Sequence, residues 1–272
     1  MAFGSLCEII AATHLSYYVH APIDDMGGLF LTAPSGHLKT TAAEILSEFE
    51  RTLVISDLTV KSLVSMRGSF LGGQVRTLIF SDYAKIYKRH GSVSANIEGI
   101  IMALVSEGFR KPAFSDQRIQ STPARAVVVG CMTPEFKELH DEEWENSGFL
   151  RRFLWSYYHI EHPEFLEDAL AQWRKAELDG DFMARVPLNH TIRYTLTESE
   201  VAKIRHSLRS TSIPDKKISL VLAQKIVCVL KWKFSNKDEL KPMRIWEDFA
   251  QSLEPLNDTI LDVQERVKEN KK

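Results

Sequence analysis

The chain has 272 residues and a formal net charge of −2, with 34 lysines and arginines against 36 aspartates and glutamates. This length is enough for one large domain, or for one domain with a small appendage. The near-neutral charge gives no electrostatic reason to expect nucleic acid as a partner of the whole surface. No apolar run is long enough to span a membrane, and the N-terminus lacks the features of a signal peptide. We therefore expect a cytoplasmic protein that does not bind membranes.

The cysteines are odd in number and show no C-x-x-C spacing: Cys7, Cys131 and Cys228. A disulfide framework or a zinc site is not expected, and a reducing compartment is the natural setting. The nine histidines show no metal-ligand spacing either.

Five short apolar runs, rich in β-branched or aromatic residues, predict strands. They are Gly28–Thr32, Thr52–Ser56, Thr77–Phe80, Ala126–Gly130 and Phe153–Ile160. Helical periodicity separates the first four of them, at Thr41–Glu50, Val60–Met66 and Ser94–Glu107. Strands that alternate with helices predict an α/β fold in which helices cover both faces of a parallel sheet.

Helices are also predicted near both ends of the chain. Leu6–Val19 is apolar at helical spacing and is expected to pack against the sheet edge. The helices predicted after Glu161 are Pro163–Ala176, Thr197–Leu208, Ser219–Phe234 and Met243–Leu253.

Thr197 and Glu200 have the spacing of a capping box at the start of one of these helices. The charged end of the chain, from Asn257 onward, is expected to fray. The predicted organisation is an N-terminal helical segment (1–24), an α/β core (25–161) and a smaller C-terminal helical domain (162–272).

The first predicted strand leads into a short polar turn, and Lys39-Thr40-Thr41 then opens a predicted helix. This is the layout of a P-loop, in which backbone N–H groups and the lysine bind phosphates and the next hydroxyl holds Mg²⁺. The usual G-x-x-x-x-G-K-[ST] pattern is altered, because Ala33 and Leu38 replace the glycines and only Gly36 remains. The predicted phosphate-binding residues are Ala33, Pro34, Ser35, Gly36, His37, Leu38, Lys39, Thr40 and Thr41.

A solvated lysine at a helix start is the alternative interpretation of Lys39. A cation there opposes the helix dipole, and a bound anion would relieve that cost. The pattern therefore favours a site for ATP and Mg²⁺, with Lys39 on the phosphates and Thr40 on the metal.

Asp82 follows a mostly apolar strand, which is a Walker B pattern, and it would hold Mg²⁺ through water. An acid that merely ends a strand is the alternative. In many sites of this kind a second acid follows directly and polarises the attacking water. Here Tyr83 occupies that position, so the second acid is absent. Two further strands end in Asp57 and Thr133, and open α/β sheets bind ligands at this edge.

Asp57 is the candidate general base that orients the attacking water, with a plain turn residue as the alternative. Thr133 could hydrogen-bond the γ-phosphate or the water, or it could simply begin a turn before Pro134.

Arg151 and Arg152 lie between apolar residues just before the fifth strand, where a cation is costly without an anionic partner. We interpret Arg152 as an arginine finger that completes the site of a neighbouring subunit. The alternative is an internal salt bridge to Glu142, Glu143 or Glu145.

A basic segment with an aromatic residue follows the third helix, and its candidate contacts to a nucleic-acid backbone are Arg110, Lys111 and Arg118. A solvated loop is the alternative. A similar basic patch consists of Lys85, Lys88, Arg89 and His90.

In this order, the motifs resemble ASCE-type P-loop ATPases, and in particular the AAA+/RecA-like ATPases of phages and plasmids. Leu150-Arg-Arg-Phe153 is similar to the Leu-Ser-Arg-Phe finger motif of minichromosome-maintenance-type helicases. Ser219–Phe234 with Met243–Leu253 is similar to the helical lid of such proteins. The resemblance covers about residues 25–160.

The resemblance implies a three-layer P-loop fold with strand order 5-1-4-3-2 and a small lid-like helical domain. It also implies Mg-ATP hydrolysis at subunit interfaces, often in a hexameric ring on DNA with other replication proteins, in a bacterial host or phage-infected cell. The leading hypothesis is thus a helicase-like ATPase motor. The alternatives are a nucleotide-binding switch or loader subunit with little turnover, which the lost glycines and the missing acid favour, and a small-molecule kinase.

Overall fold

The computed structural model describes residues 3–21, 25–37, 39–56, 58–88, 91–110, 122–158, 171, 191–209, 217–235 and 238–253. Several sequence predictions lie outside the described residues: Leu38, Asp57, Arg89, His90, Lys111, Arg118, the charged end from Asn257, and the helix at 163–176 apart from Ala171.

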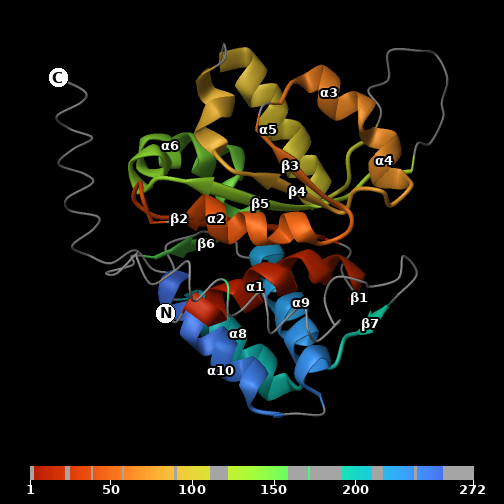
Figure 1. Ribbon diagram of the computed structural model, residues 1–272, viewed down its shortest axis with the longest axis vertical. Helices are drawn as coiled ribbons and strands as arrows, with labels where there is room; N and C mark the ends of the chain where they lie inside the picture. The colour runs from red at the N-terminus through yellow and green to blue at the C-terminus, as the bar shows by residue number, and fades with distance from the viewer. Residues whose placement is uncertain are drawn as a thin grey trace.

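A five-stranded parallel sheet forms the centre of the fold, as predicted (Figure 1). Its strands are β2 (Gly28–Thr32), β3 (Thr52–Ile55), β4 (Thr77–Phe80), β5 (Val127–Met132) and β6 (Phe153–Tyr157). They lie in the order β3-β4-β5-β2-β6, and every neighbouring pair is parallel. Numbered 1 to 5 along the chain, these strands run 5-1-4-3-2 from the β6 edge. A second, two-stranded sheet of β1 (Val19–His20) and β7 (Ile192–Arg193) was not predicted.

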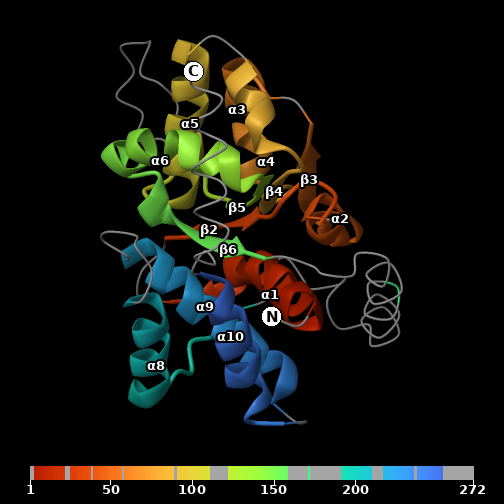
Figure 2. The same cartoon turned by 90° about the vertical axis from the view of Figure 1, so that its left-hand side faces the viewer.

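Helices cover both faces of the large sheet (Figures 1 and 2). On one face lie α3 (Val60–Ser65), α4 (Arg67–Leu71), α5 (Gly91–Val105) and α6 (Pro134–Ser147). On the other lie α1 (Phe3–Leu15), α2 (Lys39–Glu44), α8 (Glu198–Arg209), α9 (Lys217–Phe234) and α10 (Lys241–Ala250). Short 3-10 turns complete the described elements: η1 (Ser16–Tyr18), η2 (Ile45–Glu48), η3 (Tyr83–Lys88), η4 (Leu150–Arg152) and η6 (Gln251–Leu253).

The strands divide the core into two layers because successive side chains point to opposite faces. In β2, Leu29 and Leu31 pack on the α1 side, whereas Phe30 packs on the α5 side. Because both faces of these strands are buried, their sequences are apolar at nearly every position.

The N-terminal helix α1 lies under a face of the sheet, and the prediction that it packs at the sheet edge was wrong. Its side chains share one core with Leu29 and Leu31 of β2 and Val129 of β5, the two strands inside the sheet. Helix α1 is apolar around most of its circumference, from Leu6 to Leu15. A helix that is apolar on all sides is stable only when it is buried on all sides. In this fold α9 and α10 pack against α1 in addition to the sheet.

Helix α9 joins the C-terminal helices to the sheet. The Ser219 hydroxyl donates to the carbonyl oxygens of Arg151 and Phe153, both at 3.0 Å. The buried Lys225 ammonium donates to the carbonyl oxygen of Asp25 at 2.7 Å. Among the described residues, no helix is long and apolar enough to cross a membrane.

Helix α8 begins with the predicted capping box. The Thr197 N–H donates to Glu200 Oε2 at 2.7 Å, and the Glu200 N–H donates to Thr197 Oγ1 at 3.3 Å. This local prediction is confirmed because both partners lie within one helical turn.

Candidate functional site

The polar loop that follows β2 is held by a tight turn. The His37 N–H donates to the carbonyl oxygen of Pro34 at 3.4 Å, and Gly36 has a φ of 84°. This left-handed value is what a type II turn requires at its third position. A Cβ placed on Gly36 would meet no atom within 4 Å, so the loop is open on that side.

Lys39 begins α2 and folds back over the loop. Its Nζ donates to the carbonyl oxygen of Pro34 at 3.2 Å. Burial lowers the pKa of Lys39, and the neighbouring Cys131, Asp82 and Glu135 oppose that shift. The ammonium therefore lies in a partly buried place with carboxylates nearby, where a phosphate would be a strong partner.

The helix that Lys39 opens is shorter than predicted. Helix α2 ends at Glu44 and continues as the 3-10 turn η2, although the periodicity predicted a helix as far as Glu50. A helix of this length adds little dipole. Any phosphate affinity must therefore come from the loop and from Lys39.

Thr40 contacts the residue that follows strand β4, two strands away from β2 in the sheet. Its hydroxyl donates to the carbonyl oxygen of Ser81 at 3.0 Å, one residue before Asp82. Asp82 is partly buried, and within the described part of the chain no hydrogen bond reaches its carboxylate. The structure thus brings Lys39, Thr40 and Asp82 together, although 41 residues separate Thr40 from Ser81.

The end of β5 also lies against the loop. The Ala33 N–H donates to the carbonyl oxygen of Met132 at 3.3 Å, and the Cys131 thiol donates to the carbonyl oxygen of Lys39 at 3.3 Å. Burial raises the pKa of Cys131 to about 12. Cys131 therefore stays a neutral thiol that packs under the loop.

Thr133 caps α6, a helix that was not predicted from the sequence. Its hydroxyl accepts a hydrogen bond from the Phe136 N–H at 3.4 Å, and Pro134 follows in the first turn. A capping threonine before proline and an acid, here Glu135, is a helix-start signal. That signal could have identified both the helix and Glu135.

The ends of β3 and β4 lie close together. Ser56 and Leu58, on either side of it, line one small hollow together with Asp82. Asp57 itself lies outside the described residues.

Tyr83, which follows Asp82, points into the core. Its ring is fully buried against Phe30, Phe80, Trp144 and Phe149. Its hydroxyl has no hydrogen-bond partner among the described residues. Tyr83 therefore does not take the place of an acid at the site.

Arg152 lies at the amino-terminal ends of the strands, whereas the loop lies at their carboxyl-terminal ends. Phe153 pairs with Gly28 at the start of β2, whereas the loop follows Thr32 at its end. The rise of a strand makes this separation about 13 Å. The Arg152 guanidinium donates to the carbonyl oxygen of Gly148 at 2.7 Å and to Ser106 Oγ at 3.3 Å. It does not reach its own loop in this arrangement.

The predicted basic segment is described only at its start. Arg110 is exposed, next to the antiparallel bridge between Phe109 and Ala124. Lys111 and Arg118 lie outside the described residues, so the predicted nucleic-acid contact stays a prediction.

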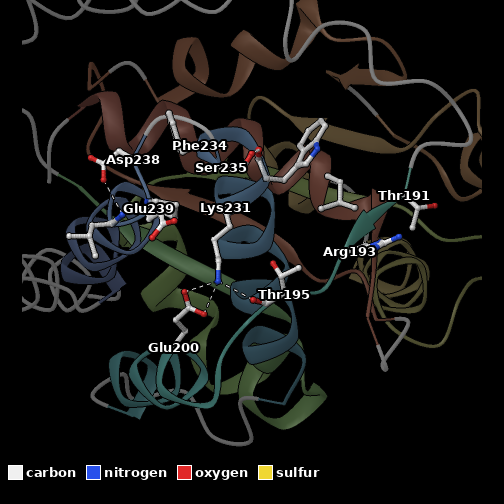
Figure 3. A pocket seen from close by; sticks show the side chains of 13 residues that line it. Thr191, Arg193, Thr195, Glu200, Lys231, Phe234, Ser235, Asp238 and Glu239 are labelled. Carbon is white, nitrogen blue, oxygen red and sulfur yellow. Dashed lines mark hydrogen bonds and ion pairs between the residues drawn. The ribbon is translucent and has the colours of Figure 1, made fainter.

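A cavity of about 630 Å³ lies among β7, α8, α9 and the start of α10 (Figure 3). Inside it, the Lys231 ammonium bonds both carboxylate oxygens of Glu200 at 2.9 Å and the carbonyl oxygen of Thr195 at 3.0 Å. None of the predicted site residues lines it. Its lining comes from segments far apart in the sequence, so no local pattern indicated it.

Comparisons of this chain with protein-family models, with curated proteins and with solved structures gave no match. Within the described ranges, no group of three or more His, Cys, Asp or Glu side chains is placed to hold a metal ion.

Proposed function

We propose that the chain is an Mg²⁺-dependent, ATP-binding and ATP-hydrolysing protein, with the nucleotide at the loop after β2. The observation that carries this proposal is the hydrogen bond from Thr40 to Ser81, which holds the lysine-bearing helix against the end of the strand that presents Asp82. A cation, a hydroxyl and a carboxylate thereby meet beside an open turn. The P-loop class of fold and the lid-like role of the C-terminal helices belong to the same proposal.

The side chains present suit Mg-ATP. Magnesium keeps several waters and takes one or two protein oxygens together with phosphate oxygens. The Thr40 hydroxyl and the Asp82 carboxylate are such oxygens. Bound magnesium would neutralise charge on the phosphates during transfer, while Lys39 and the N–H groups of the loop would bind the remaining oxygens.

The wider assignment rests on the resemblance and on the position of Arg152. A guanidinium at the far edge of the sheet suits a finger that acts on a neighbouring subunit, which requires an oligomer such as a ring. The resemblance extends the proposal to a helicase-like motor in phage or mobile-element DNA replication.

A nucleotide-binding switch with little turnover is the second candidate. The sequence favours it, because Tyr83 and not an acid follows Asp82 directly. ATPase assays with and without single-stranded DNA separate the two candidates: DNA-stimulated turnover supports the motor, and binding without turnover supports the switch.

The test of nucleotide binding is the variant Lys39→Ala, with the exposed Lys61→Ala as its control. We expect Lys39→Ala to lose affinity for Mg-ATP by about 100-fold, since a charge-assisted contact to phosphate is removed. Calorimetric titration measures the affinity. Equal affinity in both variants would contradict the proposal.

A further inference from the structure

Two acids follow strands at the edge of the sheet where the Lys39 loop lies: Asp82 follows β4, and Glu135 lies in the first turn of α6 after β5. Asp82 and Glu135 both oppose the shift that burial imposes on Lys39. Asp82 is the proposed magnesium ligand. Glu135 is the second acid at this edge of the sheet.

The strand order places the end of β5 closer to the loop than the end of β3. Strand β5 is the direct neighbour of β2, whereas β3 is three strands away. With about 4.8 Å between neighbouring strands, the end of β3 lies roughly 14 Å from the end of β2, against about 5 Å for β5. Glu135 follows β5, and Asp57 follows β3.

Contacts of the backbone carry β5 along the loop as far as α6. The Ala33 N–H bonds Met132 O, and the Cys131 thiol bonds Lys39 O. Thr133 then caps α6, which places Glu135 in the first turn of a 14-residue helix. Glu135 is partly buried there, so its backbone is held on a rigid element beside the end of β5.

Resting on the ATP-hydrolysing function proposed above, we infer that Glu135 is the carboxylate that orients the attacking water and accepts its proton. Glu135 takes this proton as the water oxygen bonds to the γ-phosphorus. The bond from that phosphorus to the bridging oxygen breaks, and the bridging oxygen leaves on ADP with the electron pair. The products are ADP and inorganic phosphate, and general-base help of this kind contributes about 10²- to 10⁴-fold.

The test compares four variants of the full chain: Glu135→Gln, Asp57→Asn, Lys39→Ala and, as the control on the same helix, the exposed Glu142→Gln. Turnover is measured with Mg-ATP in the presence of single-stranded DNA. Affinity is measured with a non-hydrolysable ATP analogue, and the nucleotide retained by the purified protein is identified by chromatography.

We expect Glu135→Gln to lose turnover by about 100-fold or more. It should bind the analogue as tightly as the wild type or more tightly, because a negative charge near the phosphates is removed. It should also retain ATP where the wild type retains ADP. A role for Glu135 in stability alone would weaken the binding of the analogue together with turnover.

Wild-type turnover by Glu135→Gln overturns the inference, whether or not Asp57→Asn is inactive. If the wild type binds the analogue but does not turn over ATP, the role of Glu135 is also overturned, whereas nucleotide binding at the loop is still supported. Unchanged binding and turnover in Lys39→Ala would instead overturn the proposed function itself.

Discussion

The hydroxyl of Thr40 lies 3.0 Å from the carbonyl oxygen of Ser81 and donates a hydrogen bond to it. This bond joins the start of α2 to the end of β4, so that the residue after Lys39 faces the strand that precedes Asp82. A metal ion between Thr40 and Asp82 would take the hydroxyl oxygen as a ligand. The lone pairs of this oxygen remain available while its proton is donated to Ser81.

Thr40→Val tests the proposed metal site. The variant keeps the shape of the side chain but removes the hydroxyl, so we expect the affinity for Mg-ATP to fall by about 10-fold or more and to lose its dependence on Mg²⁺. Thr40→Ser is the matched control, because it keeps the hydroxyl. Titrations with and without a chelator measure the effect, and a Thr40→Val protein that still responds to Mg²⁺ would exclude Thr40 as a ligand.

Mixing two inactive variants tests the proposed finger. Arg152→Ala would keep an intact nucleotide site but lack the finger, whereas Lys39→Ala would keep the finger but lack the site. If Arg152 acts on a neighbour, the mixture should regain ATPase activity well above the sum of its parts. Particle mass in solution, with and without ATP, shows whether mixed oligomers form. Mixed oligomers without regained activity would exclude a role in trans.

Glu98 makes the stability of the fold depend on pH. It is 4 % exposed and accepts hydrogen bonds from Tyr87 and Trp144. Burial raises its pKa from 4.5 to about 7; the two hydrogen bonds lower it, and Glu143 raises it. The folded protein therefore binds a proton that the unfolded chain releases, and stability falls as the pH rises from about 4.5 to 7.

Glu98→Gln should remove this dependence. At about 1.4 kcal/mol per pH unit, the variant should gain on the order of 3 kcal/mol relative to the wild type between pH 4 and pH 8. Urea unfolding at these two pH values measures the difference, with the exposed Glu142→Gln as the control. An equal pH dependence in the wild type and in Glu98→Gln would contradict the prediction.

Gly148 ends α6 with a φ of 73° and holds the two arginines close to the backbone. A Cβ there would lie 2.9 Å from Arg151 Nε and 3.0 Å from Arg152 Nη1. Gly148→Ala should therefore destabilise the protein by about 1–2 kcal/mol. It should also displace Arg152.

Gly99→Ala is the opposite case and the matched control. Gly99 lies within α5, and a Cβ there meets nothing within 4 Å. We expect this change to stabilise the protein by about 0.5–1 kcal/mol. Thermal unfolding of both variants measures the contrast, and equal effects would show that the backbone angle of Gly148 is not the cause.

Local patterns in the sequence predicted the strands of the large sheet well. Gly28–Thr32 and Thr77–Phe80 are strands at the predicted bounds, and the capping box of Thr197 forms as expected. These features depend on residues near one another in the chain, where periodicity and turn chemistry act. Strand β5 extends past its predicted end at Gly130 to Met132, because Cys131 and Met132 pair with Leu31 and Thr32 of β2.

The candidate site was only partly predictable. The sequence indicated Lys39, Thr40 and Asp82 as residue types in suitable motifs, and the sheet brings them together. From the sequence, Thr133 was interpreted as a hydroxyl at a strand end or as the start of a turn. In the structure its hydroxyl caps α6. Glu135 was missed, since the placement of its helix near the loop depends on the pairing of β5 with β2.

By itself, the sequence determined that strands and helices alternate and that a polar loop with Lys39 follows the first strand of the sheet. Only the tertiary structure decided that α1 lies under the sheet face, that Tyr83 is buried away from the site, and that Arg152 sits at the far edge. The physical reason is that patterning sets which face of an element is apolar, whereas the choice of partner for that face depends on contacts between distant segments.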